Sequence, residues 1–339
     1  MSAATLTDIT KTSSPSLGSF GTEATPLPQA SASNVERPTL VIGDIHGHLT
    51  RFESLLTQEG IIGTCPECMG FGDTPETTHS ESMCPRCDGD GFCRINYDVR
   101  VVLVGDIGHF GKGGSPTGEG GEGCPTGDMR RWLYATRWAD TILWGNHDRA
   151  VFENAHHHSG FEPPMVETYK IMRDASDSGQ LLLATVAHGF VITHAGIHSA
   201  FRDNKVDEIY KTDPEAFVDW VNQLADPFVV VDDRNLAGVV DSIPRKRGGF
   251  AHAGGILWRD IDEKLYPGFR QIFGHSADYK ERSVRYCWEK MYSRKAFPKL
   301  EPPVGYCIDI GGISDQKGSS ENCLAGIWLP DERIVEWRG

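Results

Sequence analysis

Five short segments carry side chains suited to hard metal ions, and they occur in a fixed order along the chain. They are GDIHG at 43–47, GD at 105–106, GNHD at 145–148, HAG at 194–196 and GH at 274–275. Each directly follows a short apolar run, and such runs ending before a turn are typical of buried strands. Because residues just past the carboxyl ends of strands gather at one edge of an open α/β sheet, we expect these ligands to converge.

The ligand types in these segments favour a transition-metal site rather than a calcium site. The candidates are two carboxylates, three imidazoles and one amide: Asp44, His46, Asp106, Asn146, His194 and His275. Asp44 and His46 are two residues apart in a turn, so both can reach a single ion, and Asp106 can bridge two ions. A mixed nitrogen and oxygen set suits Mn²⁺, Fe or Zn²⁺, whereas Ca²⁺ prefers oxygen alone. Two such ions about 3.5–4 Å apart would clamp a phosphoryl group and generate hydroxide at neutral pH.

The order and spacing of these segments resemble those of the phosphoprotein phosphatase family of calcineurin-like metallophosphoesterases. The resemblance covers roughly residues 38–339 and includes Leu257-Trp258-Arg259 and the IDIGG run at 308–312. The spellings HAGI and GNHD are most similar to the bacterial and phage-type branch, which includes diadenosine tetraphosphatases. The resemblance implies an α/β fold: a four-layer sandwich of two mixed β-sheets flanked by helices.

The resemblance also implies a role for each residue of the site. The first ion would be held by Asp44, His46 and Asp106, and the second by Asp106, Asn146, His194 and His275. His147 would protonate the leaving oxygen, and Arg259 would contact the phosphate. The implied reaction is hydrolysis of a phosphate monoester, by in-line attack of a hydroxide held between the two ions and without a covalent intermediate.

The second segment departs from the pattern of this family, which continues as GDxVDRG. Here the run is Gly105-Asp106-Ile107-Gly108-His109-Phe110. His109 stands where the family has an Asp that orients the proton-donating His, and Phe110 stands where it has an Arg that grips the phosphate. A guanidinium makes a bidentate phosphate contact that Phe cannot make. The departure puts phosphate positioning and leaving-group protonation in question, while the bridging Asp106 is retained.

Nearby charged residues are candidate replacements for the two missing side chains. Lys112 follows two residues after Phe110, Arg149 directly follows the GNHD segment, and a basic run occupies 245–247. Each of these is also compatible with an ordinary solvated charge. Asp148 is a candidate to orient His147, although adjacent side chains often diverge.

A cysteine-bearing insertion at 63–95 predicts a second, separate metal site. Cys65-Pro66-Glu67-Cys68 and Cys84-Pro85-Arg86-Cys87 are separated by 15 residues, which is zinc-ribbon spacing. Both motifs extend as CxxCxGxG and resemble half of the cysteine-rich region of DnaJ-type co-chaperones, although only the motif is shared. We expect one structural zinc on four thiolates; reactive or disulfide-bonded cysteines are the alternative. The insertion is acidic, which disfavours nucleic acid and favours a scaffold or protein-docking role.

The composition of the chain limits which partners and which cellular setting we expect for it. The 339 residues have a formal net charge of −14, which argues against nucleic acid as the main partner. Residues 1–36 are rich in Ser, Thr, Ala and Pro and are expected to be disordered, followed by one phosphoesterase domain at 37–339. No apolar run is long enough for a membrane helix, and no secretory signal is visible. Nine cysteines with metal-type spacing favour a reducing, cytoplasmic setting.

Three functions are compatible with these residues. A serine/threonine protein phosphatase is the first, and a diadenosine tetraphosphatase-like nucleoside polyphosphate hydrolase is the alternative. A non-catalytic phosphoryl-binding regulator is the third. The sequence leaves open the physiological substrate, the native metals and the oligomeric state.

Overall fold

The chain divides into two units, Met1–Val35 and Glu36–Gly339, and the structure, a computed structural model, describes residues of the second. The described residues are 36–47, 49–70, 84, 86–87, 89–108, 125–152, 166–203, 207–224, 239–275, 283–288, 291–293, 303–310 and 323–338. The segment 1–36, predicted to be disordered, therefore lies outside them except for Glu36. Among the described residues, no helix is long and apolar enough to cross a membrane.

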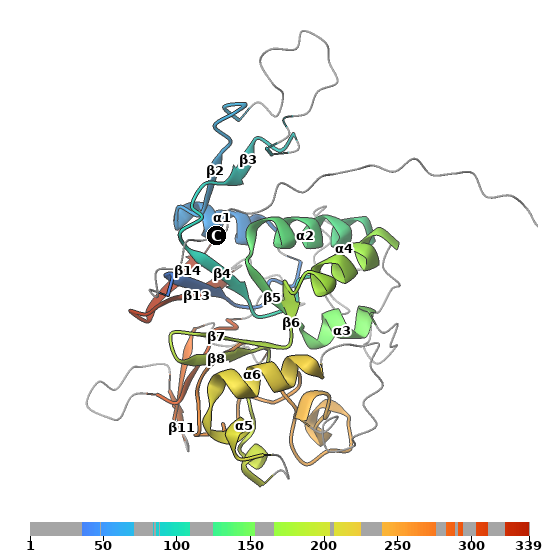
Figure 1. Cartoon of the computed structure of the whole chain (residues 1–339), viewed down its shortest axis with the longest axis vertical. Helices are drawn as coiled ribbons and strands as arrows, with labels where there is room; N and C mark the ends of the chain where they lie inside the picture. Colours follow the sequence, from blue (N-terminus) through green and yellow to red (C-terminus); the bar gives the residue numbers. More distant parts are fainter. Residues whose placement is uncertain are drawn as a thin grey trace, which may run out of the picture. The chain divides into compact units, whose positions relative to one another are not determined.

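Two six-stranded sheets form the centre of the second unit (Figure 1). The first has the order β14-β13-β1-β4-β5-β6, and the second has the order β11-β10-β12-β9-β8-β7. The strands of the first are β1 (Thr39–Ile42), β4 (Arg100–Leu103), β5 (Thr141–Leu143), β6 (Leu181–Leu182), β13 (Cys323–Leu329) and β14 (Arg333–Arg338). Those of the second are β7 (Ala184–Ala187), β8 (Phe190–Thr193), β9 (Arg270–Phe273), β10 (Arg285–Trp288), β11 (Met291–Ser293) and β12 (Gly305–Cys307).

Both sheets are mixed, and the strands that carry the site are parallel neighbours. In the first sheet β1, β4 and β5 run parallel, while β13 pairs with β1 in the antiparallel sense. In the second sheet β8 and β9 run parallel, and β7 pairs with β8 in the antiparallel sense. The prediction of an α/β fold with mixed sheets is thereby confirmed. The parallel neighbours bring their carboxyl ends to a common edge.

Alternate residues of β1 belong to two different cores. Val41 packs in a cluster that contains residues of both sheets, including Ile192 of β8 and Ile272 of β9. Leu40 and Ile42 point the other way, into the cluster that contains the helices. This two-residue period is the signature of a strand buried on both faces. The two sheets therefore share one core.

The helices that the structure describes contain between 4 and 14 residues. They are α1 (Leu49–Gln58), α2 (Pro125–Trp138), α3 (Asn146–Phe152), α4 (Val166–Asp177), α5 (Ile209–Thr212) and α6 (Pro214–Gln223), with 3₁₀ turns η1 (Ser199–Asp203) and η2 (Arg245–Arg247). Helix α1 contacts β13 and β14, whereas α6 contacts β7 and β8 of the other sheet. The start of α6 is fixed by Asp213, whose side chain accepts from the Glu215 and Ala216 N–H groups. The four-layer order implied by the resemblance stays a prediction.

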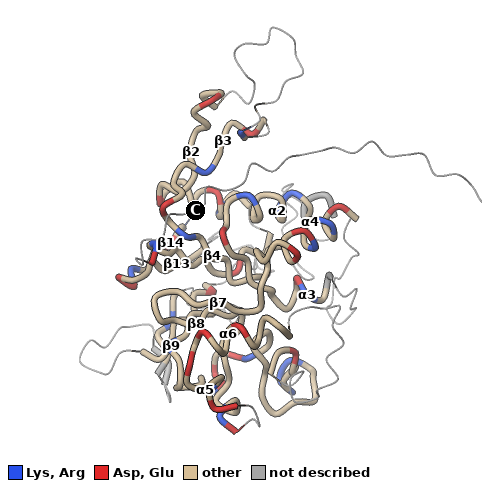
Figure 2. Tube along the Cα trace, viewed as in Figure 1, with Lys and Arg blue, Asp and Glu red and all other residues tan. Residues whose placement is uncertain are grey.

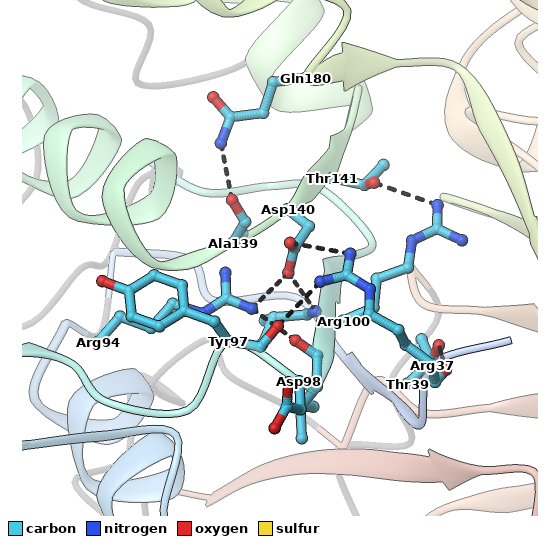
Figure 3. A network of polar contacts seen from close by, with 12 residues as sticks. Arg37, Thr39, Arg94, Tyr97, Asp98, Arg100, Ala139, Asp140, Thr141 and Gln180 are labelled. Carbon is cyan, nitrogen blue, oxygen red and sulfur yellow. Dashed lines mark hydrogen bonds and ion pairs between the residues drawn. The ribbon is translucent and has the colours of Figure 1, made fainter. Parts of the chain in front are cut away.

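The cysteine insertion ends in a small antiparallel sheet of β2 (Ile62–Thr64) and β3 (Phe92–Arg94). Figure 3 shows how Arg94 joins this stem to the first sheet. Its guanidinium donates to Asp140 Oδ2 at 2.7 Å and to the Trp138 carbonyl at 3.2 Å. The same Asp140 carboxylate accepts from the Val101 N–H at 2.8 Å and from Arg37 at 3.3 Å. The stem is thus anchored to the strand β5 that leads into the GNHD segment.

Candidate metal centre and active site

Each predicted ligand lies just past a strand of one of the two sheets. Asp44 and His46 follow β1, Asp106 follows β4, Asn146 opens α3 after β5, His194 follows β8 and His275 follows β9. His46, Asp106 and His275 have φ values of 45°, 49° and 68°. Non-glycine residues in this left-handed region are uncommon and are strained by about 1–3 kcal/mol, and they concentrate at functional sites. The backbone strain here falls on three of the six predicted ligands.

The first ligand group consists of Asp44, His46 and Asp106, which are all buried. Nε2 of His46 lies 3.8 Å from Asp44 Oδ2 and 3.8 Å from Asp106 Oδ2. Asp44 Oδ2 accepts the His275 N–H at 2.9 Å, while Asp44 Oδ1 is buried with no hydrogen-bond partner in the part of the chain that the structure describes. A buried carboxylate oxygen without a donor is costly unless a cation occupies the space beside it.

The second group is built around His194. Its Nδ1 lies 2.9 Å from the Val104 carbonyl, which can only accept, so Nδ1 carries the proton and Nε2 has a bare lone pair. That lone pair faces the Asn146 amide oxygen at 2.9 Å, Nδ1 of His275 at 3.2 Å and Asp106 Oδ2 at 3.6 Å. Acceptor atoms therefore converge on one point, and this arrangement is stable when a cation lies between them.

The electrostatics of the two groups agree with cation binding. Burial raises the pKa of Asp44 well above its usual value, and the charges of Asp309 and Asp106 raise it further. Burial lowers the pKa of His194 to about 4 and holds the pKa of His275 well below its usual value. Both imidazoles are therefore neutral at pH 7, which is the form that binds a metal. Clustered carboxylates together with neutral imidazoles make a site that lacks positive charge.

Two glycines let the backbone approach the ligands closely. A Cβ built on Gly274 would overlap Asp44 Oδ1 and lie 2.8 Å from Val104 Cγ2. A Cβ on Gly145 would similarly overlap Asp106 Oδ1. The glycines that precede His275 and Asn146 are therefore required by the space that the carboxylates occupy.

Gly274→Ala is expected to displace the Asp44 carboxylate and to weaken divalent-metal binding at least about 10-fold, as seen when groups that orient ligands are changed. Isothermal titration of chelated protein with Mn²⁺ measures this effect. Gly189→Ala is the control, because nothing lies within 4 Å of the Cβ position of Gly189, although its φ of 75° disfavours a side chain on its own. The control is expected to cost about 1–2 kcal/mol of stability from backbone strain while leaving Mn²⁺ affinity unchanged. Equal Mn²⁺ affinities for the two variants would contradict the steric account.

His147 and Asp148 lie side by side but face different partners. The His147 N–H donates to Asp106 Oδ1 at 3.0 Å, and its half-buried ring stands edge-on to His46 with ring centroids 5.6 Å apart. Asp148 is 2 % exposed and accepts from the Ile107 N–H at 3.0 Å and the Gly145 N–H at 3.2 Å. Its carboxylate thus fixes the turns that carry Asp106 and Asn146, whereas the ring of His147 lies at the first ligand group.

Arg259 is fully buried and turned toward the backbone. Its Nε donates to the Ala195 carbonyl at 2.9 Å, and Nη1 donates to the carbonyls of Asp260 at 2.8 Å and Glu263 at 2.6 Å. The guanidinium lies 4.5 Å from the centroid of the Phe273 ring. These contacts hold the HAG turn against the loop that follows Trp258, and they engage Nε and Nη1 of the guanidinium.

The other candidates for phosphate binding divide into two groups. Arg149 lies on α3 and forms an ion pair with Asp241 at 3.5 Å. Lys112, together with His109 and Phe110, lies outside the described residues.

The four cysteines of the insertion form a buried cluster. Their ligand atoms lie within 4.8 Å of one another, with 3.8 Å between the sulfurs of Cys65 and Cys84 and 3.5 Å between those of Cys68 and Cys87. Tetrahedral zinc with bonds of about 2.3 Å separates its sulfurs by about 3.8 Å, whereas a disulfide requires about 2.05 Å. All four are free thiols, so the disulfide alternative does not hold for them.

Backbone N–H groups face the sulfurs of Cys65 and Cys87, while burial raises the pKa of both thiols, in Cys87 to about 12. Burial raises the pKa of Cys65, but N–H groups of Cys68 and Glu67 lower it, to about 7 overall. The Gly91 N–H donates to the sulfur of Cys87 at 3.3 Å. A glycine after the motif permits the turn that lets this backbone amide face the sulfur, and Gly91 has a φ of 74°. The donor set and spacing fit one zinc ion.

Two further residues act electrostatically on the ligands: Asp309, which was not predicted as a site residue, and Arg247, which belongs to the basic run considered as a replacement for the missing phosphate contact. Asp309 is 5 % exposed, and its charge raises the pKa values of both Asp44 and His194, so its carboxylate lies within electrostatic reach of both groups. Arg247 lowers the pKa values of His194 and His275 in the same way. A sequence signal for Asp309 was present, since it lies in the IDIGG run, but that run did not indicate proximity to the metal ligands.

Comparisons with known proteins give distant likenesses. No family model and no curated protein matches the chain. The similar solved structures include a protein provisionally identified as a diadenosine tetraphosphatase, with a TM-score of 0.37, 15 % identity and coverage of 91 % of this chain and 96 % of that one. A cold-active protein-tyrosine phosphatase from a psychrophilic Shewanella species has a TM-score of 0.43 and 13 % identity, covering 90 % of this chain and 80 % of its own.

A protein serine/threonine phosphatase from Saccharomyces cerevisiae is also similar, with a TM-score of 0.42, 12 % identity and coverage of 89 % of this chain and 79 % of that one. These structural neighbours are phosphatases by name. Because their TM-scores lie below 0.5, the functional assignment depends on the geometry of the site.

Proposed function

We propose that the chain is a metal-dependent phosphoesterase with two divalent ions bound between the carboxyl ends of β1, β4, β5, β8 and β9. One observation carries the proposal: two ligand groups share the carboxylate of Asp106, and bare acceptor atoms face one another in both. A single-ion structural site does not need a shared carboxylate, whereas a pair of ions that clamps a phosphoryl group does. We take the ions to be Mn²⁺, Fe or Zn²⁺ from the mixed ligand set.

Different residues of the chain have different roles in the proposed hydrolysis. When bound, the two ions would neutralise the carboxylates, polarise a phosphoryl oxygen and supply a nucleophile at neutral pH by lowering the pKa of water. Asp148 keeps the turn at 105–108 in place through the Ile107 N–H, and Arg259 keeps the HAG turn in place through the Ala195 carbonyl. His147, beside the first ligand group, donates a proton to the leaving oxygen as the phosphorus–oxygen bond breaks.

Phosphoprotein is the proposed substrate class, with serine and threonine phosphates as the expected esters. The alternative is a nucleoside polyphosphate such as diadenosine tetraphosphate, which the HAGI and GNHD spellings favour. The test is a substrate panel on protein loaded with two equivalents of Mn²⁺. A higher kcat/KM on a phosphoserine peptide than on diadenosine tetraphosphate supports the first, and the reverse order supports the alternative. If neither substrate is hydrolysed, the result would favour the third function, a non-catalytic phosphoryl-binding regulator.

His147→Asn tests the proton-donor role and is expected to lower kcat on a phosphoserine peptide by about 10²-fold, the usual contribution of a general acid. On para-nitrophenyl phosphate the loss is expected to be several-fold smaller, because para-nitrophenolate leaves without a proton. Steady-state kinetics on both substrates give the comparison. Loss of the same size on both substrates would assign His147 to metal or phosphate binding instead.

For the insertion we propose a structural zinc on Cys65, Cys68, Cys84 and Cys87, in a compartment such as the cytoplasm that keeps thiols reduced. The described part of the insertion carries exposed apolar side chains on and beside its strands, at Met69, Phe92 and Ile95. These side chains support a protein-docking role for the insertion, as its acidic composition does.

A further inference from the structure

A pocket lies between the segment that follows the HAG turn and the segment 239–256. It encloses about 350 Å³, part of which is open to solvent, and none of its lining residues is charged. The Ile256 N–H donates to the Val239 carbonyl at 2.9 Å, which holds two residues of one wall together. The lining includes Ile197, His198, Phe201, Val239, Ala253 and Ile256. Apart from one imidazole, the pocket is therefore apolar.

Two contacts place this pocket beside the candidate metal centre. Ala195, which directly follows the ligand His194, donates its N–H to the carbonyl of Ile256 at 2.7 Å. At the other end of the segment, Asp241 forms an ion pair at 3.5 Å with Arg149 of α3, the helix that opens with another predicted ligand. The wall 239–256 is thus joined to two of the turns that carry metal ligands.

The chain between ligand and pocket limits which part of a substrate can enter the pocket. Ile197 is three residues beyond His194, and three residues of chain span at most about 10–11 Å. A peptide whose phosphoserine lies at the metal centre covers the same distance in two or three residues. We propose that the pocket binds an apolar side chain of a phosphopeptide, two or three residues from the phosphoserine; the proposal rests on the protein phosphatase function above.

The lining favours an uncharged side chain such as that of leucine. Aliphatic walls gain free energy when they cover an apolar group, whereas a charged group would lose its water there without gaining a partner. Figure 2 shows basic and acidic residues together in this part of the chain. These charges pair with one another outside the pocket, Lys246 with Asp262 and Arg247 with Asp260. The pocket therefore differs from its surroundings in lacking charge.

A nucleobase of a nucleoside polyphosphate is the competing occupant. Bases are held largely by stacking on flat side chains, and the one phenyl ring in the lining is that of Phe201, which is 4 % exposed. This ring packs against those of Phe217 and Tyr266, with centroids 5.2 and 5.3 Å away. The surface of Phe201 is thus covered by other rings, and the remaining apolar lining is aliphatic. That chemistry suits an aliphatic side chain better than a base.

The imidazole of the lining is suited to hold the peptide backbone. Nδ1 of His198 accepts the Ala200 N–H at 2.9 Å, and burial lowers the pKa of His198. The ring is therefore neutral at pH 7, with its proton on Nε2. Nε2 donates to no residue in the part of the chain that the structure describes, so a carbonyl of the bound peptide can accept from it.

The test measures peptide binding to Mn²⁺-loaded protein by fluorescence anisotropy, with a phosphonate analogue in place of phosphoserine so that nothing is hydrolysed. The peptides differ only in having Leu, Ala or Glu at one of the three positions on either side of the phosphonate. At one position two or three residues away, the Kd of the Leu peptide is expected to be about 10- to 100-fold lower than that of the Ala peptide. The Glu peptide should bind no better than the Ala peptide.

Filling the pocket should remove this preference. Ala253 lines it at a half-buried position, and Ala253→Leu is expected to bring the Leu and Ala peptides to within about twofold of each other. Ala200→Leu fills it from the other wall, at an exposed position that tolerates a larger side chain. Ala251→Leu is the matched control, because Ala251 is half-buried on the same segment but does not line the pocket, and it should keep the full preference.

His198→Phe keeps a ring but removes the donor. It is expected to raise the Kd of the Leu and Ala peptides by a similar factor of about 3 to 10, as for loss of one hydrogen bond. Thermal melts and Mn²⁺ analysis show whether each variant is folded and loaded. An unchanged Kd for both peptides would overturn the assignment of His198 as the donor.

The pocket and the phosphatase function fail separately. A wild-type protein that hydrolyses para-nitrophenyl phosphate, but does not bind these peptides or binds all of them within twofold, would overturn the pocket alone. A Leu preference that survives in both Ala253→Leu and Ala200→Leu would also overturn it. A Leu preference abolished by the filling variants, in a protein that hydrolyses no phosphate ester, would support the pocket and overturn the phosphatase function.

Discussion

Asp106→Asn is expected to lower kcat/KM on para-nitrophenyl phosphate by at least about 10³-fold, the upper range for loss of one electrostatic contact in an active site. The reason is its place in both ligand groups: Asp106 Oδ2 lies 3.8 Å from Nε2 of His46 and 3.6 Å from Nε2 of His194. An amide keeps the size of the side chain but removes the charge, so neither ion is held fully. Steady-state kinetics with Mn²⁺ analysis measure the loss and its cause.

Asp98→Asn is the control for Asp106→Asn, because Asp98 is exposed and lies before β4 rather than after it. The control is expected to keep full activity and the full Mn²⁺ complement. The thermal midpoint of metal-free Asp106→Asn is expected to match or exceed that of metal-free wild type, since one buried negative charge is gone. If Asp106→Asn keeps the wild-type turnover, the shared carboxylate is not required for hydrolysis.

The second large effect concerns the zinc ribbon. Replacing Cys65 and Cys84 by serine is expected to remove one zinc per chain and to unfold the insertion around β2 and β3. Structural zinc contributes about 10–16 kcal/mol of apparent binding free energy in small domains, and a two-stranded sheet of this size is not stable alone. Limited proteolysis should therefore cut the variant within the insertion, while wild type resists at the same protease concentration.

Cys93→Ser is the matched control for the zinc ribbon, because Cys93 is buried in the same cluster but is not among the four ligands. It should keep its zinc and its resistance to protease. Hydrolysis of para-nitrophenyl phosphate is expected to stay within about threefold in both variants, since the insertion supplies none of the ligands of the candidate metal centre. A double variant with wild-type zinc content would show that the thiolates do not hold the ion.

The ligand positions could be predicted because their signals are local. A β-branched run followed by Gly-Asp or Gly-Asn-His-Asp encodes a strand and the turn after it, and parallel pairing then brings the turns together. The same holds for the cysteine spacing, where two knuckles define four ligands for one ion. In both cases the residues that matter are adjacent in sequence, so backbone geometry follows from the motif.

The surroundings of the ligands could not be predicted in this way. Arg259 and Arg247 are only 12 residues apart and both are arginines near the last motif, yet one is enclosed by carbonyls and the other is exposed. That difference depends on the Ala195 carbonyl and the Phe273 ring, which come from two other strands. Asp309 likewise reaches Asp44 from the far end of the chain. Contacts of this range are set by packing rather than by pattern.

The most direct test of the central claim is the rate of para-nitrophenyl phosphate hydrolysis as a divalent metal is returned to protein stripped of its active-site ions but still holding its zinc. Mn²⁺, Fe²⁺ and Zn²⁺ are added in separate titrations. The dimetal account predicts that activity with at least one of them rises to a plateau at two equivalents per chain. A plateau at one equivalent, or no hydrolysis with any of the three at two bound equivalents, would contradict it.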